Sequence, residues 1–69
     1  MLDVQKVKIG SRIEGYGGQI MVVTKILKNS FVGYSEYCYE KFTKKKETMS
    51  LIFSTIKNPH YSKYIKLMG

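Results

Sequence analysis

The sequence has few of the residues on which most enzymes and disulfide-stabilised proteins depend. Its 69 residues include one cysteine, Cys38, one histidine, His60, and one aspartate, Asp3. A single thiol forms no disulfide within the chain, and it fits a reducing compartment. The scattered cysteine and histidine supply neither the four ligands of a zinc site nor a convincing nucleophile and base. We therefore predict a protein that is not an enzyme and that holds no metal and no cofactor.

Long apolar runs are also missing. No stretch approaches the roughly 20 apolar residues of a membrane-spanning helix, and the first ten residues, MLDVQKVKIG, have no apolar run of the kind found in secretion signals. We expect a cytoplasmic protein that makes no membrane contact. The length predicts one small domain over residues 1–69, which buries only roughly 60% of its unfolded surface.

Arginine is scarce, and lysine supplies nearly all of the positive charge. The chain has one arginine and eleven lysines, with a net charge of +7. Sequence-specific readout of bases favours the planar fork of arginine, so this ratio argues for backbone contact instead. Residues 41–69 carry seven lysines against a single acid, Glu47. A basic half of this kind predicts an anionic partner, although a charge that serves only solubility is the alternative.

The glycine-rich stretch GYGG, residues 15–18, invites comparison with a phosphate-binding loop. It lacks the spacing of the P-loop and the third glycine of the dinucleotide motif. It also precedes an expected strand, whereas phosphate capture uses the start of a helix. We interpret it as a tight hairpin turn.

The spacing of the apolar residues predicts four strands and one helix. Alternation predicts strands over residues 7–14, 19–28, 31–39 and 47–54. The second of these, QIMVVTKILK, is apolar on both faces, which predicts a central strand with both faces covered. Asn58 and Pro59 are typical of a helix start. The helix predicted over residues 59–68 packs on the sheet through apolar residues at helical spacing: Tyr61, Tyr64, Ile65 and Met68.

Four or five short antiparallel strands in a chain of this size must curl, because a flat sheet would leave one face bare. The stretch KIGSRIEGYGGQIMVVTKI, residues 8–26, is a strand, a glycine turn and a long β-branched strand. In this it resembles SH3-like small barrels of the KOW and Tudor type. The resemblance implies a mainly β fold, a small barrel of four to five antiparallel strands with a short C-terminal α-helix. The lysine- and tyrosine-rich style is also similar to accessory proteins of phages and plasmids.

The stretch SEYCYEKFTKKKE, residues 35–47, crowds aromatic rings and positive charge together. Lysines neutralise phosphates, and tyrosine rings stack on unpaired bases with roughly 1–3 kcal/mol each. We therefore predict a contact surface made of Tyr34, Tyr37, Tyr39, Lys41, Lys44, Lys45 and Lys46. The alternative is that Tyr37, on the same strand face as Phe31, fills the core, and that the lysines form a solvated loop.

Two functions follow from these residues. The first is non-catalytic binding of nucleic acid without sequence specificity, through the lysine-rich loop and the adjacent tyrosines. The second is a small protein-interaction module, for instance a phage-type inhibitor that docks on an acidic surface of a host protein, since tyrosine-rich patches suit protein interfaces. Binding to random nucleic acid and its dependence on salt separate the two.

Overall fold

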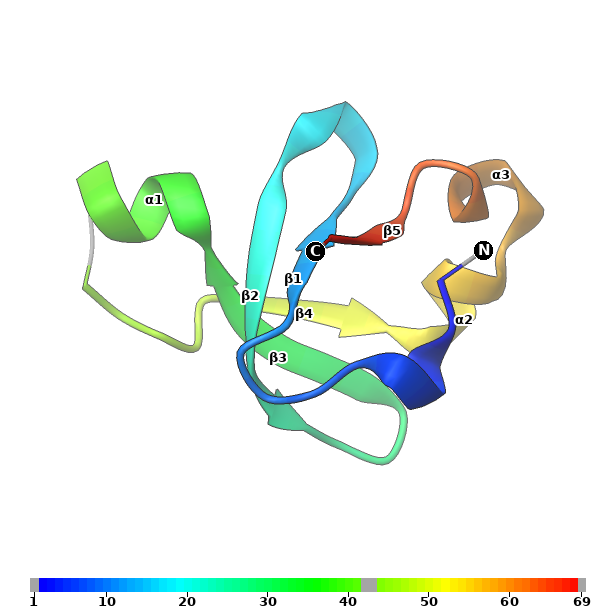
Figure 1. Cartoon of the computed structure of the whole chain (residues 1–69), viewed down its shortest axis with the longest axis horizontal. Helices are drawn as coiled ribbons and strands as arrows, with labels where there is room; N and C mark the ends of the chain where they lie inside the picture. Colours follow the sequence, from blue (N-terminus) through cyan, green and yellow to red (C-terminus); the bar gives the residue numbers. More distant parts are fainter. Residues whose placement is uncertain (1, 42–43, 69) are drawn as a thin grey trace.

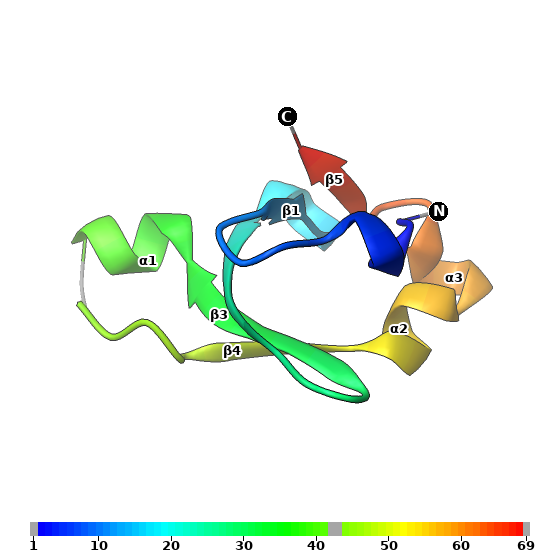
Figure 2. The same cartoon turned by 60° about the horizontal axis from the view of Figure 1, so that its bottom comes forward.

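The computed structural model describes residues 2–41 and 44–68. Across these residues the fold is mainly β, with five antiparallel strands in the order β4-β3-β2-β1-β5 (Figure 1). The sheet curls into a half-barrel, with β1 above and the paired strands β3 and β4 below the interior in Figure 2. The strands are β1 (Arg12–Glu14), β2 (Ile20–Ile26), β3 (Ser30–Ser35), β4 (Met49–Ile52) and β5 (Lys66–Met68).

Short helical segments connect the strands and flank them. Two are 3-10 helices, η1 (Val4–Lys6) before β1 and η2 (Tyr16–Gly18) in the β1–β2 turn; three are α-helices, α1 (Glu36–Lys41), α2 (Phe53–Lys57) and α3 (Pro59–Ser62). In the β1–β2 turn, Gly17 and Gly18 have φ angles of 81° and 80°, which side chains with a Cβ rarely adopt. The expected glycine turn is therefore present. At the other end of the sheet, α2 and α3 follow β4 and lead the chain back to β1 (Figure 1).

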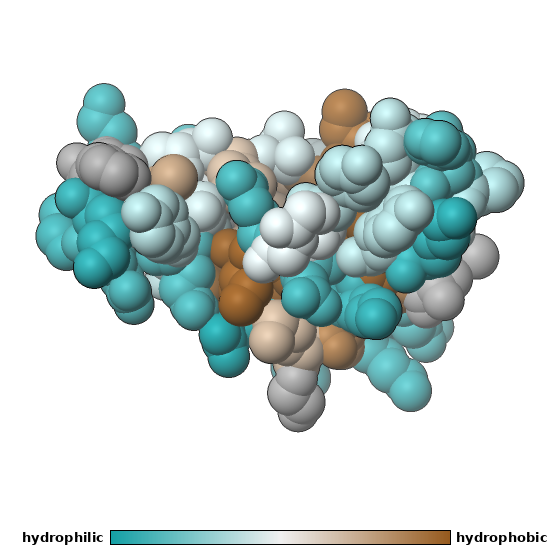
Figure 3. Space-filling model, turned by 90° about the horizontal axis from the view of Figure 1, so that it is seen from above, coloured by the Kyte–Doolittle hydropathy of each residue, from teal (hydrophilic) through white to brown (hydrophobic). Residues whose placement is uncertain are grey.

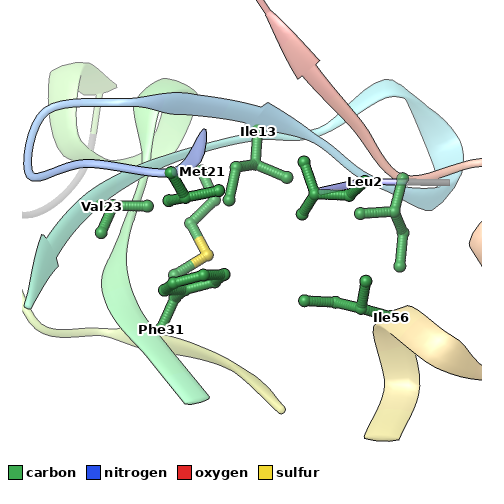
Figure 4. Close-up of a cluster of buried hydrophobic side chains, with 8 residues drawn as sticks. Leu2, Ile13, Met21, Val23, Phe31 and Ile56 are labelled. Atoms are coloured by element: carbon green, nitrogen blue, oxygen red, sulfur yellow. The ribbon is translucent and has the colours of Figure 1, made fainter. Parts of the chain in front are cut away.

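The core lies inside the curl of the sheet. Ile13, Met21 and Val23 point inward from β1 and β2, and Phe31 faces them from β3 (Figure 4). Ile56 of α2, with no exposed surface, closes the side of this cluster. Met49, Leu51 and Phe53, which alternate along the predicted strand 47–54, all pack against the core, as alternation requires of an inward face.

The first two predicted strands are longer than the observed ones. The regular strand begins at Arg12, because Gly10 adopts a φ of 91° and interrupts the extended backbone that was predicted from residue 7. The predicted strand 19–28 corresponds to β2. Its inner-face residues Met21 and Val23 are buried as expected, whereas Ile20 and Val22 on the outer face are only half-buried. The sheet curls around one side only, so the expectation of two covered faces is wrong.

The third predicted strand, 31–39, ends early, and the chain turns into α1 after Ser35. The buried Ser35 hydroxyl accepts a hydrogen bond from the backbone N–H of Cys38 at 3.4 Å, a contact typical of a helix start. Because α1 replaces the end of the strand, Tyr37 does not share a face with Phe31. Tyr37 is 63% exposed, so the core interpretation of this residue is wrong.

Each of the last two predicted elements corresponds to two elements in the structure. The predicted strand 47–54 is β4 followed directly by α2, and the predicted helix 59–68 is α3 followed by β5. The start of α3 is as predicted: Asn58 accepts a hydrogen bond from the His60 N–H at 2.9 Å, with Pro59 in the first turn. The helix stops at Ser62 because the free edge of β1 pairs with residues 66–68. Ile65 is buried as predicted, whereas Tyr64 is 40% exposed.

An irregularity in β2 shapes the outer face of the sheet. Val23 pairs with Gly33 and Lys25 pairs with Val32, so Thr24 is an extra residue between two paired positions. The Thr24 hydroxyl lies 3.3 Å from the carbonyl oxygen of Val32 and 3.2 Å from that of Lys46, to either of which it can donate. The bulge therefore places a hydrogen-bonding side chain on the outer face, beside the loop that precedes β4.

Candidate binding surfaces

The predicted contact residues are partly brought together on the outer face of the half-barrel. The ring of Tyr34, on β3, lies against the ring of Tyr39, on α1, with 4.5 Å between centroids and 32° between planes. Both side chains are half-buried. The helix that ends β3 is what makes this contact possible, because it turns Tyr39 back over the strand. The pair joins α1 to the sheet.

Lys44 extends this aromatic pair with a positive charge. Its ammonium nitrogen lies 5.3 Å from the centroid of the Tyr39 ring, a cation–π distance. The contact of Thr24 with the Lys46 carbonyl oxygen ties the same loop to β2. Lys41, Lys45 and Lys46 are exposed. We call Tyr34, Tyr39, Lys44, Lys45 and Lys46 the outer cluster; residues 42 and 43 of the predicted basic loop lie outside the described residues.

Two acidic side chains close to the outer cluster form ion pairs with cations of β1 and β2. Glu47, directly after the lysines, lies 3.4 Å from the ammonium of Lys25. Glu36, at the start of α1, accepts two hydrogen bonds from the Arg12 guanidinium, at 2.8 and 2.9 Å. This hydrogen bonding and the charge of Glu36 raise the pKa of Arg12 above its ordinary value. In Figure 3, hydrophilic residues lie at the α1 end of the molecule and also at the opposite end, with apolar residues visible between them.

Tyr37 does not belong to the outer cluster. It follows Glu36 on α1, two positions before Tyr39, so the two rings leave the helix in nearly opposite directions. Tyr37 instead borders a shallow depression that it shares with the β1–β2 turn and with Glu36 and Glu40. The acidic side chains there disfavour phosphate, so the predicted seven-residue surface is divided by α1.

A second surface, which the sequence did not predict, lies where the curled sheet remains open. An apolar pocket of about 290 Å³ separates β4 from β1 and the β1–β2 turn. Its walls are mostly apolar, and the lining includes two tyrosines, Tyr16 and Tyr61. Its lining residues include Ile13, Met21, Met49, Leu51, Ile65 and Tyr61. We call this the seam pocket.

Tyrosine and lysine meet again beside the seam pocket. Tyr16, 68% exposed, contacts the edge of Tyr64 with 5.0 Å between ring centroids. The ammonium of Lys63 lies 5.1 Å from the centroid of Tyr64. The sequence predicted Tyr64 on a packed helix face and assigned no role to Tyr16, which lies in the glycine turn. The only sign of a role for Tyr16 in the sequence was its large aromatic ring, which a turn does not require.

The remaining reactive side chains lie apart. Cys38 is on α1 and His60 on α3, at opposite ends of the molecule (Figure 1). The His60 ring makes an edge contact with Tyr61, 4.8 Å between centroids. Within residues 2–41 and 44–68, no three His, Cys, Asp or Glu side chains cluster as a metal site would require. None of the helices in this described part is long and apolar enough to cross a membrane.

Comparison of the chain with protein-family models, curated proteins and solved structures finds no match. The two surfaces are therefore interpreted from their own chemistry.

Proposed function

We propose that the protein binds nucleic acid through its outer cluster, without catalysis and without sequence specificity. The observation that carries this proposal is the joint placement of Tyr34, Tyr39 and Lys44 on one face, next to Lys45 and Lys46. Lysines give phosphate affinity that is independent of sequence. The tyrosine pair offers π surface to an unpaired base once the flexible Lys44 side chain moves to a phosphate.

The fold type is part of the same proposal. Four strands run as a meander from β1 to β4, and β5 returns to pair with β1. This connectivity supports an SH3-like half-barrel, as the resemblance of residues 8–26 implied. Fold alone does not decide function, because such small barrels bind nucleic acid in some cases and proteins in others.

The test is a triple substitution, Lys44→Gln, Lys45→Gln and Lys46→Gln, measured by titration of a random-sequence oligonucleotide at several salt concentrations. Each phosphate contact contributes roughly 0.7–0.9 to the slope of log affinity against log salt. We expect the triple variant to bind unrelated sequences more weakly and to flatten the slope by about two to three units. Stability should barely change, since exposed charges contribute little to folding.

A matched control removes the same charge elsewhere. Lys6, Lys8 and Lys28 are exposed and lie outside the outer cluster. Their triple glutamine variant should retain most of the salt slope. Equal effects of the two variants would show that net charge alone drives binding. Wild-type protein that binds no oligonucleotide at physiological salt would overturn the proposal, and the lysines would then be tested against an acidic protein surface, the second candidate function.

A further inference from the structure

The strand β4 is an open edge of the sheet without the usual protection. It ends the strand order, and among the described residues its only strand partner is β3. Its four residues, MSLI, include no charge and no proline. By contrast, β5 at the opposite edge begins with Lys66. Unprotected edges present backbone donors and acceptors that pair readily with another strand, so β4 is suited to accept one.

The direction of the backbone groups on β4 follows from its pairing. Phe53, just beyond β4, donates its N–H to the carbonyl oxygen of Asn29 at 2.9 Å. Donors alternate in direction along an antiparallel strand, so Ser50 and Ile52 direct their N–H groups away from β3. Both residues are exposed, Ile52 by 51%. An added strand would find these donors accessible.

The seam pocket lies where the inward side chains of such a strand would go. Met49 and Leu51 project from β4 toward the interior and line the pocket. Ile13 and Ile65 line it as well. Side chains of a strand alternate between faces, so every second residue of an added strand would enter this apolar space. The pocket therefore selects an apolar side chain at that position.

The charge of the residues near β4 indicates which kind of strand can be added to its edge. Lys44, Lys45 and Lys46 come shortly before β4 in the chain, and Lys57 ends α2 shortly after it. A second copy would bring another net charge of +7 to the same place, which opposes edge pairing between copies. An acidic segment has the complementary charge.

We propose that β4 and the seam pocket bind an extended, acidic peptide segment of another protein by strand addition. The segment places an apolar side chain in the pocket, pairs with the N–H groups of Ser50 and Ile52, and sets its acidic residues beside Lys44, Lys45 and Lys46. Main-chain hydrogen bonds give affinity in this mode, and the pocket gives selectivity. The site goes beyond the proposed function, because it uses the sheet edge and the interior instead of the outer cluster's rings.

The probe is a fluorescein-labelled heptapeptide with two glutamates followed by alternating valine and threonine, titrated by fluorescence anisotropy. We expect Ser50→Pro to weaken its binding by roughly fivefold to tenfold, because the variant removes an outward donor. Proline is tolerated on edge strands, and the ladder with β3 keeps its bonds. Tyr61→Ala, at the pocket rim, tests the pocket separately and should also weaken binding. Circular dichroism checks the fold of both variants.

Amide exchange of the wild-type protein with and without the peptide locates the contact. We expect added protection at Ser50 and Ile52.

Peptide that fails to bind, or that binds both variants as tightly as the wild type, overturns the proposal. Protection confined to α1 and the outer cluster overturns it as well, as does a short thymidine oligonucleotide that protects Ser50 and Ile52 in place of the peptide. A concentration-dependent dimer that protects these amides without peptide would assign the edge to a second copy. Ser50→Pro should leave oligonucleotide binding unchanged. A negative result for the peptide site can therefore be told apart from a negative result for nucleic-acid binding.

Discussion

The ring centroids of Tyr39 and Tyr34 lie 4.5 Å apart, so a helical residue and a strand residue five positions apart in the sequence form one aromatic pair. Aromatic pairs of this kind contribute about 0.5–1.5 kcal/mol beyond the burial of their area. Tyr39→Ala should therefore lower the free energy of unfolding by at least that amount in urea denaturation. Tyr39→Phe keeps the ring and should change it by less than about 0.5 kcal/mol. Equal losses for the two variants would show that the hydroxyl, and not the ring contact, matters.

Ile65 connects α3 to β5 and is 4% exposed. Its truncation leaves a cavity in a thin core, so we expect Ile65→Ala to cost about 2–4 kcal/mol of unfolding free energy. Leu67→Ala is the matched control, because Leu67 is 39% exposed. A cost below about 0.5 kcal/mol at Ile65 would show that the segment after α3 is not docked on the sheet.

Gly33 faces the irregular part of β2 at close range. A Cβ at this position would collide with the carbonyl oxygen of Val22. We expect Gly33→Ala to destabilise the protein by about 1–3 kcal/mol through overpacking, measured by thermal and urea unfolding. Gly15→Ala provides the control: a Cβ there meets only the Gln19 carbonyl oxygen at 3.9 Å, an ordinary contact. That variant should be neutral, or more stable by up to about 1 kcal/mol.

Amide exchange should rank the strands by their place in the sheet. Among the described residues, β2 and β3 each have a strand on both sides, whereas β4 and β5 each have one neighbouring strand. We expect the slowest exchange at Val23 and Phe31 and fast exchange at residues 44–46. Exchange at Val23 as fast as in that loop would contradict the half-barrel.

The inner strands were predictable from sequence because their signal is local. Alternation in β2 and β3, and a glycine turn before β2, are visible within a few residues. The break after Ser35 was not, because Tyr37, Cys38 and Tyr39 favour strands by propensity. A hydroxyl that accepts the Cys38 N–H reverses that preference. The pairing of residues 66–68 with β1 joins opposite ends of the chain, so no local pattern reports it.

The two candidate surfaces also differ in how far they could be predicted from the sequence. Charge and composition grouped the lysines with Tyr34, Tyr37 and Tyr39. The predicted strand 31–39 placed Tyr34 and Tyr39 on opposite faces, so their ring contact, which depends on α1, was not predicted. The seam pocket depends on the curl of the sheet, which brings β4 opposite Ile13 and beside Tyr61. Its members are spread along the chain and have ordinary core identities. Only their arrangement in space distinguishes them.

The pairing of β5 with β1 has a consequence for the order of folding. The meander from β1 to β4 forms through contacts between segments close in sequence, but β1 gains its second neighbour only from residues 66–68. Contacts of such long sequence separation slow folding, because a large loop must close before they form. A nascent chain therefore passes through a stage in which the outer edge of β1 is unpaired. During that stage the chain is most exposed to aggregation, and chaperone dependence should be greatest until residue 68 has left the ribosome.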